Sequence, residues 1–208
     1  MLTEKHTRHF DEIEKYYKPK IIDGVPDFQA LGWENMKAHI LRFDILANNV
    51  DLNNKKLLDV GCGLGSFFEY LKRNKIEASY TGVDILPEMI AYAKKKHNEG
   101  VFSCLDIFDG KTKFPGDFDV VYASGIFNLD LGNNEEFVAK ALERFFDLAK
   151  EIISFNLLHR DSPDKEDNYF YTNPDFICGL LKKYKGRFYE VEYYHSYQKN
   201  DFTVIIRR

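Results

Sequence analysis

A glycine-rich turn with an acidic residue in front of it is the part of this sequence best suited to chemistry. Asp59, Gly61 and Gly63 lie in the stretch LLDVGCGLG, where an apolar run typical of a buried parallel strand leads directly into glycines. A helical pattern with Phe67 and Leu71 on one side follows. A strand that breaks into glycines and restarts as a helix presents bare backbone N–H groups and a positive helix end to a ligand. The stretch therefore predicts a seat for a cofactor.

The glycine spacing separates the possible cofactors. A dinucleotide-binding loop has its third glycine three positions after the second, where this chain has Ser66. A P-loop requires a Gly-Lys-Ser/Thr sequence, which does not follow here. Asp59 would lie poorly beside a pyrophosphate and well beside a cationic amino group. These features favour a cofactor that carries an amino group, and they disfavour a nicotinamide dinucleotide.

The stretch LLDVGCGLG resembles motif I of the class I S-adenosylmethionine-dependent methyltransferases, and the resemblance extends from about Ile40 to the C-terminus. It implies S-adenosyl-L-methionine as the methyl donor and S-adenosyl-L-homocysteine as the product. We expect Asp59 and the carbonyl group of Gly61 to receive the amino group of the cofactor. We expect Cys62 and Gly63, in the same loop, to contact the cofactor as well.

Asp84 ends the next predicted strand, in the stretch TGVDILPEM. An acidic side chain there can accept hydrogen bonds from both ribose hydroxyl groups, which is how this fold class binds a ribose. The alternative is an acid at a helix N-terminus, because Pro87 predicts the start of a helix. If Asp84 binds the ribose, Ile85 and Met89 supply apolar surface near the adenine, although a methionine on a helix is also an ordinary core residue.

Two further contacts are implied by the resemblance. In that family an acid after the third strand, here Asp106, bonds the adenine amino group, and the following N–H, here of Ile107, bonds a ring nitrogen. The alternative for Asp106 is a turn in which its side chain bonds the local backbone. Class I enzymes often bind the cofactor's carboxylate from the segment before the first strand, which makes Arg42 the candidate. A solvated helix arginine is the other interpretation of Arg42.

The segment after the fourth predicted strand, SGIFN at 124–128, is where a methyl group would meet its acceptor. It contains no Asn-Pro-Pro-Tyr, Asp-Pro-Pro-Tyr or Pro-Cys sequence, so transfer to nucleobases or to a glutamine amide is disfavoured. We expect Ser124, Gly125 and Asn128 to line the methionine end of the cofactor and the acceptor site.

Several other residues are weaker candidates for substrate contacts. They are an N-terminal tryptophan, two tyrosines and one histidine: Trp33, Tyr169, Tyr171 and His195. Aromatic residues in such numbers are more often core residues. His195 could act as a general base near the acceptor, but a structural or surface histidine is the better explanation. The six histidines form no pattern that suggests a metal site, so we expect no metal.

The elements that position these residues alternate between strands and helices. Strands are predicted at 56–60, 79–84, 101–104, 118–124 and 151–157, with helices at 65–74, from Pro87, and from Asn133 or Asn134 to about Lys150. Such alternation implies a parallel sheet covered on both faces. A helix from Pro174 to Gly186, then runs at 187–195 and 202–208, predict a closing antiparallel hairpin. The expected fold is α/β, a Rossmann-like three-layer sandwich with a mostly parallel seven-stranded sheet.

The whole chain of 208 residues reads as one domain. Helices at 3–17 and 33–48 would form an N-terminal cap, residues 1–50, on a cofactor-binding core, residues 51–208. The net charge of −4 makes nucleic acid an unlikely partner, and no apolar run reaches membrane-spanning length. Three widely spaced cysteines suggest reduced thiols in the cytoplasm.

We therefore predict a methyltransferase that acts on an oxygen or nitrogen atom of a small molecule. Transfer from a sulfonium centre is an in-line displacement that depends mainly on proximity and orientation, so no residue is assigned as a catalytic base. Two alternatives remain: an NAD(P)-dependent oxidoreductase, and a protein that binds S-adenosylmethionine without catalysis. The sequence indicates neither the acceptor nor the oligomeric state.

Overall fold

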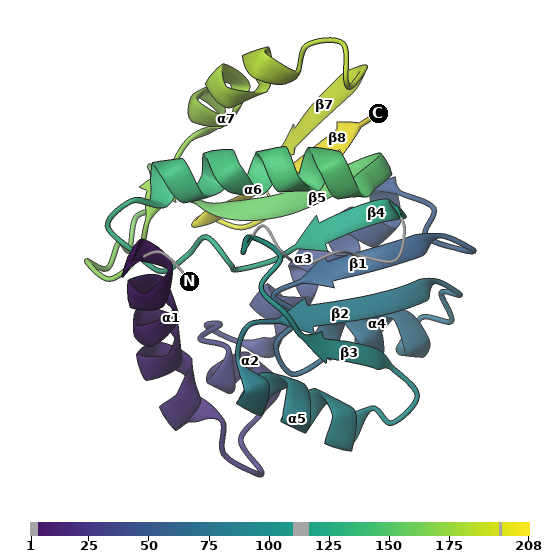
Figure 1. Ribbon diagram of the computed structural model, residues 1–208, viewed down its shortest axis with the longest axis vertical. Helices are drawn as coiled ribbons and strands as arrows, with labels where there is room; N and C mark the ends of the chain where they lie inside the picture. The colour runs from purple at the N-terminus through teal and green to yellow at the C-terminus, as the bar shows by residue number, and fades with distance from the viewer. Residues whose placement is uncertain (1–3, 110–116, 196) are drawn as a thin grey trace.

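The computed structural model describes residues 4–109, 117–195 and 197–208, which form a central sheet with helices on both faces (Figure 1). The helices are α1 (Glu4–Tyr17), α2 (Asp27–Ala30), α3 (Met36–Asn49), α4 (Ser66–Arg73), α5 (Pro87–Lys96), α6 (Asn134–Leu148) and α7 (Pro174–Leu181). Short 3₁₀ helices follow α1 and α7, at Lys18–Lys20 and Lys182–Tyr184. The strands are β1 (Lys56–Val60), β2 (Ser79–Asp84), β3 (Val101–Cys104), β4 (Phe118–Ala123), β5 (Ala149–His159), β6 (Tyr171–Thr172), β7 (Glu190–Tyr194) and β8 (Asp201–Arg207).

The order of the strands in the sheet explains where a ligand can bind. The order is β3-β2-β1-β4-β5-β8-β7, and the two-residue strand β6 pairs with the end of β5. Strands β1 to β5 are parallel, whereas β8 is antiparallel to both of its neighbours. The chain builds outward from β1 to β3 and then continues on the other side of β1 with β4. Ligands in open α/β sheets bind at such a reversal, at the carboxyl ends of the strands.

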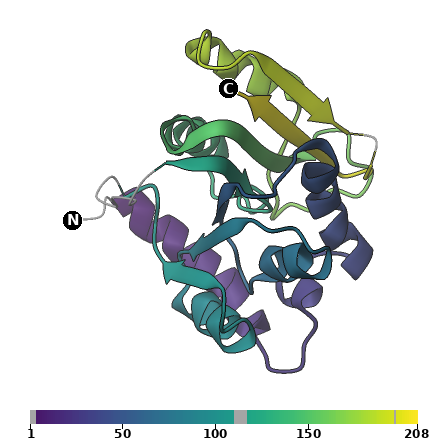
Figure 2. The same cartoon turned by 90° about the vertical axis from the view of Figure 1, so that its right-hand side faces the viewer.

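Alternate residues of each strand pack on opposite faces of the sheet. In β1, Leu57 belongs to a cluster formed with α3, α4 and α5, and Leu58 belongs to a cluster formed with α6 and α7. Both leucines are fully buried. The view from the side shows the sheet between these two helical layers (Figure 2). The near-continuous apolar composition of β1 therefore follows from burial on both faces.

Helix α1 belongs to neither layer and lies across the carboxyl ends of the strands (Figure 1). Its residues Phe10, Ile13 and Tyr17 pack in a third, smaller apolar cluster with Leu86 and Met89. The apolar face of α1 thus covers the edge of the sheet where the parallel strands end.

The predicted fold class is confirmed, including the closing antiparallel hairpin. The predicted first helix is present as α1, while Thr3, its first predicted residue, lies outside the described residues. The predictions omitted α2 and β6, because elements of four and two residues leave no periodic pattern. Among the residues that the structure describes, no helix is long and apolar enough to span a membrane.

Candidate active site

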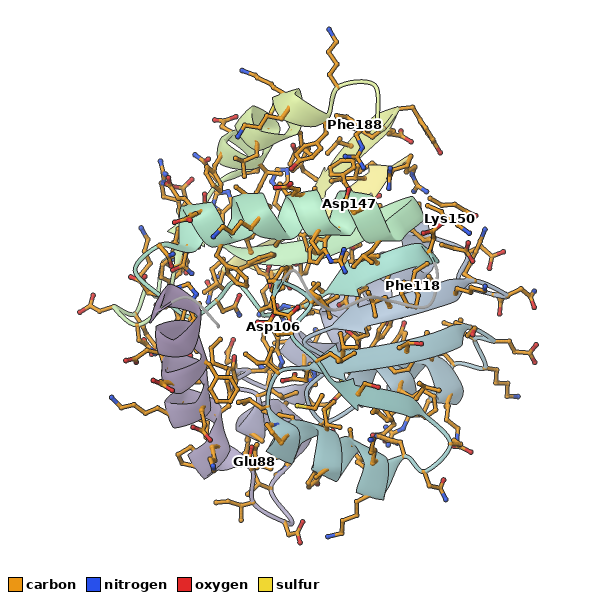
Figure 3. All side chains as sticks on the ribbon, in the orientation of Figure 1. Glu88, Asp106, Phe118, Asp147, Lys150 and Phe188 are labelled. Atoms are coloured by element: carbon orange, nitrogen blue, oxygen red, sulfur yellow. The ribbon has the colours of Figure 1, made fainter. Side chains whose placement is uncertain are left out.

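A cavity of about 410 Å³ lies at the carboxyl ends of β1, β2 and β4, beneath α1. Its walls come from α1, α3, the turns after β1 to β4, and the start of α6. Asp106, from the turn after β3, lies in this region, between α1 and the sheet (Figure 3). The cavity has the size and largely apolar lining that are typical of a small-molecule site.

The turn after β1 requires glycine at two positions. Gly61 and Gly63 have φ angles of 72° and 52°, a left-handed conformation that other residues rarely adopt. A Cβ atom on Gly61 would lie 2.3 Å from Cγ2 of Ile126, and one on Gly63 would lie 2.8 Å from Cδ2 of Leu31. The N–H group of Gly61 donates to the carbonyl oxygen of Val83 over 2.8 Å, which ties the turn to β2. The turn therefore brings bare backbone to the cavity wall.

Asp84 joins the glycine turn to the turn after β2. Its carboxylate accepts the N–H group of Gly63 over 2.9 Å and that of Leu86 over 3.0 Å. Burial raises the pKa of Asp84, and these two backbone hydrogen bonds oppose that rise. Asp84 lines the cavity, as do Ile85 and Met89. The residues predicted to contact a ribose and its base therefore lie together.

Asp59 is the most deeply placed acid in the cavity wall. Only 3% of its surface is exposed, and the Tyr80 hydroxyl donates to its carboxylate over 2.6 Å. Burial raises the pKa of Asp59 to about 7, although the hydrogen bond from Tyr80 lowers it and the nearby Asp84 raises it further. A cationic group at this position would stabilise the ionised carboxylate.

The turn after β3 shows both of the roles considered for Asp106. The side chain accepts the N–H group of Phe108 over 2.8 Å, which is the local turn, and the residue also lines the cavity. Ile107, which is buried, lines the cavity beside it.

The predicted rim after β4 is also part of the cavity wall, which includes Ser124, Gly125 and Asn128. The Ser124 hydroxyl and the Asn128 amide oxygen have no hydrogen-bond partner among the described residues. Trp33 packs against the rim: a Cβ atom on Gly125 would lie 3.0 Å from Cζ2 of the indole. Buried polar atoms without partners are uncommon, and here they lie beside a cavity that can hold a polar ligand.

Arg42, which was predicted to meet the carboxylate of the cofactor, does not belong to the cavity wall. Its guanidinium group forms a buried ion pair with Asp201 and donates to the carbonyl oxygen of Ala38. The indole of Trp33 lies 3.9 Å from the guanidinium carbon. Arg42 is not available to the cavity because its guanidinium group is paired with the carboxylate of Asp201, a β8 residue far away in the sequence.

His39, which the sequence analysis did not select, comes from the same helix as Arg42 and belongs to the cavity wall. It is 4% exposed, lines the cavity, and stacks on Trp33 with ring centroids 5.7 Å apart. Burial lowers the pKa of His39 to about 3, and the charges of Arg42 and Lys96 act in the same direction, so the imidazole is neutral. The sequence could have indicated His39 as a candidate, because it lies one helical turn before Arg42 on the same face of the helix.

Tyr122 is a second polar residue of the wall that the sequence analysis missed. Its hydroxyl group lies near that of Ser124, and neither makes a well-formed hydrogen bond within the described residues. Burial raises the pKa of this phenol far above its usual value, so the hydroxyl remains protonated and can donate. Its position in an apolar strand gave no hint of this role.

Three predicted substrate contacts lie elsewhere. Tyr169 bonds Tyr16 of α1, with the two hydroxyl oxygens 2.6 Å apart, and Tyr171 accepts the N–H group of Glu166. His195 is exposed at the end of β7. None of these three residues belongs to the cavity wall, and their contact with a substrate stays a prediction. Within the described ranges there is also no cluster of side chains suited to a metal ion.

Comparison with known proteins gives a consistent picture. Residues 57–151 match the family described as "Methyltransferase domain". A putative methyltransferase of Mycobacterium tuberculosis is 30% identical over 157 residues, which cover 72% of this chain and 91% of that protein. Two solved structures share the fold. One is magnesium protoporphyrin IX methyltransferase of Synechocystis with bound S-adenosylhomocysteine, with a TM-score of 0.69 and 15% identity over 99% of this chain and 100% of that one. The other is the N-methyltransferase NodS of Bradyrhizobium japonicum, with a TM-score of 0.65 and 14% identity over 97% and 98%.

The raised pKa of Asp59 predicts how stability depends on pH. The pKa is about 7 in the folded chain and 3.8 for the free side chain, so the folded state holds this proton more tightly. The contribution is present at low pH and is lost as the pH rises from about 4 to about 7. Replacing Asp59→Asn keeps an oxygen that can accept from Tyr80. The free energy of unfolding, measured by urea titration at pH 5 and at pH 8, should fall between these pH values in the wild type. In the Asp59→Asn variant this fall should be smaller by a few kcal/mol. An identical loss in both proteins would contradict the assignment.

Proposed function

Because this chain belongs to the class I S-adenosylmethionine-dependent methyltransferase family, we propose that it methylates an oxygen or nitrogen atom of a small, largely apolar molecule. The observation that carries this proposal is the convergence of Asp59, Asp84 and Asp106 on one cavity, around a glycine turn that has no room for side chains. Family membership assigns the cofactor, so the nicotinamide alternative no longer applies.

The residues of the cavity fit S-adenosylmethionine. When bound, it supplies a methyl group on a cationic sulfur; an acceptor lone pair forms the new bond to carbon, and the electrons of the broken C–S bond remain on sulfur. An alcohol or amine acceptor then releases its proton to water. The residues of this chain contribute binding and orientation, which supply much of the catalysis in such displacements.

We assign the cofactor contacts by the groups each residue offers. Asp59 would take the amino group, and the glycine turn at Gly61–Gly63 would let the methionine part approach the backbone. Asp84 would accept from the ribose hydroxyls, with Ile85 and Met89 against the base. Asp106 and the N–H group of Ile107 would hold the adenine edge. Their common position on the cavity wall supports these assignments.

The carboxylate of the cofactor needs a donor other than Arg42. We assign this role to His39 and Tyr122, both of which line the cavity and can donate from a neutral group. The unpartnered hydroxyl of Tyr122 supports the assignment, because binding would satisfy it.

The acceptor would occupy the part of the cavity between α1 and the segment that follows β4. Apolar side chains dominate there: Phe10, Ile13, Ile126, Leu129 and Phe137. Ser124 and Asn128 offer polar groups at the rim. The solved relatives are named for a porphyrin and for N-methylation, which is compatible with an apolar acceptor and with a nitrogen atom.

We also propose that the chain forms one domain in which two segments have different roles. Residues 1–50 would cap the site and select the acceptor, and residues 51–208 would bind the cofactor. The contribution of α1, Trp33 and His39 to the cavity wall supports this division. The free cysteines, of which Cys104 and Cys178 are exposed, fit a reducing compartment such as the cytoplasm.

The ribose assignment predicts the effect of replacing Asp84. Asp84→Ala should weaken S-adenosylhomocysteine binding by roughly 1.5–3 kcal/mol, the scale for losing hydrogen bonds to a charged group. Calorimetric titration measures this change. Glu88→Gln, on the neighbouring helix and outside the cavity wall, is the control and should bind as the wild type does. An unchanged affinity in Asp84→Ala would remove Asp84 from the ribose site.

The carboxylate assignment predicts a selective effect at His39. His39→Phe keeps an aromatic ring against Trp33 but removes the donor. The dissociation constant of S-adenosylhomocysteine should rise about tenfold, as for the loss of one hydrogen bond to a charged group. The dissociation constant of adenosine, which has no carboxylate, should stay unchanged. Equal effects on both ligands would show that His39 does not serve the carboxylate.

The acceptor class can be tested by radiolabelled methyl transfer to a panel of acceptors. We expect transfer to apolar phenols, alcohols or amines and none to sugars or nucleotides. Leu129→Asp should reduce transfer while leaving S-adenosylhomocysteine affinity within about threefold, since Leu129 lies on the segment after β4 and outside the apolar cluster that includes Met89. Tight cofactor binding with no transfer to any member of the panel would favour the non-catalytic alternative.

A further inference from the structure

A closed circuit of contacts surrounds the rim where the methyl group meets its acceptor. The N–H group of Gly125 donates to Oδ1 of Asn156 over 2.9 Å, and Nδ2 of Asn156 donates to the carboxylate of Asp201 over 3.0 and 3.2 Å. Asp201 pairs with Arg42, whose guanidinium packs on Trp33 at 3.9 Å. The indole of Trp33 returns to Gly125, where a Cβ atom would lie 3.0 Å from it.

The circuit joins residues from four parts of the fold. Gly125 follows β4, Asn156 lies in β5, Asp201 opens β8, and Arg42 belongs to α3. Asn156, Asp201 and Arg42 are at most 3% exposed. Trp33 comes from the loop before α3 and reaches the cavity. The C-terminal hairpin is thereby connected to the wall of the active site.

The buried ion pair between Arg42 and Asp201 carries a high desolvation cost. Taking two charges out of water costs several kcal/mol for each ion, and apolar replacements of buried pairs are often neutral or stabilising. Burial raises the pKa of Asp201, while Arg42, Asn156 and Tyr197 lower it. Stability alone is therefore a weak explanation for this pair, and the groups that it orients offer another.

We propose that Arg42, Asp201 and Asn156 are positioning residues for methyl transfer, which hold the indole of Trp33 and the backbone of Gly125 as the two walls that orient the acceptor. This inference rests on the proposed function of the cavity. Arg42 acts through Trp33 and His39, and Asn156 acts through the N–H group of Gly125. Trp33 itself contacts the acceptor and contributes to its selection.

The test uses the fact that Trp33 is the only tryptophan of the chain. Arg42→Met combined with Asp201→Asn removes both charges together, so neither is left buried without a partner. With S-adenosylhomocysteine saturating, the indole of this double variant should show lower fluorescence anisotropy and more quenching by acrylamide than in the wild type. The rate of methyl transfer to the acceptor panel should fall roughly 10- to 100-fold, as expected for a misplaced acceptor.

The matched control is Lys55→Met with Glu151→Gln, which removes an ion pair at the opposite end of the sheet. Its indole signal and its transfer rate should equal those of the wild type. Asn156→Ser, which leaves the ion pair in place, should lower transfer as well, and it decides the matter if the double variant does not fold.

The outcomes separate this inference from the proposed function. Unchanged indole mobility or unchanged transfer in the double variant, with S-adenosylhomocysteine still binding, would overturn the positioning role alone. A wild-type protein that does not bind S-adenosylhomocysteine would overturn the proposed function first. A loss of transfer matched by the Lys55–Glu151 control would show a general effect of charge removal and would also overturn the inference.

Discussion

The central position of β1 is the constraint on which the rest of this structure depends. The strand pairs in parallel with β2 on one side and β4 on the other, so its carboxyl end lies where the chain reverses its direction across the sheet. The turn that follows is held by hydrogen bonds to Val83 of β2 and has no room for side chains at Gly61 and Gly63. Parallel strands bring all their carboxyl ends to one edge. The parallel topology alone therefore brings Asp59, Asp84 and the segment after β4 to the same edge of the sheet.

A buried cluster of acids is the electrostatic consequence of that arrangement. Burial raises the pKa values of Asp59 and Asp84, and hydrogen bonds from Tyr80, Gly63 and Leu86 oppose the rise. Carboxylates held in this way are poor partners for one another and good partners for a cation. The site is therefore suited to a ligand with an amino group and a sulfonium, and we propose the neutral donors His39 and Tyr122 for its carboxylate.

The sequence predicted those features that depend on neighbours along the chain. The strand–glycine–helix pattern located the turn, and the acids at strand ends followed from parallel topology. Arg42 could not be predicted in the same way, because the carboxylate that takes its charge, Asp201, comes from the last strand.

The same limit applies to the covering of the cavity. The sequence predicts helix α1, but the packing of α1 across the strand ends depends on tertiary contacts. The same holds for the hydrogen bond between the hydroxyl groups of Tyr169 and Tyr16. Which apolar residues face a cavity and which face the core cannot be separated by periodicity, since both lie on the same side of a helix.

The central claim is that this cavity binds a cationic adenosyl cofactor. Calorimetric titration of the wild-type chain with S-adenosylhomocysteine, with NADH as the parallel control, tests this claim most directly. One molecule of S-adenosylhomocysteine should bind per chain with a dissociation constant on the order of micromolar, and NADH should not bind. Binding of NADH without binding of S-adenosylhomocysteine would overturn this assignment, because the backbone N–H groups of the glycine turn would then serve a pyrophosphate.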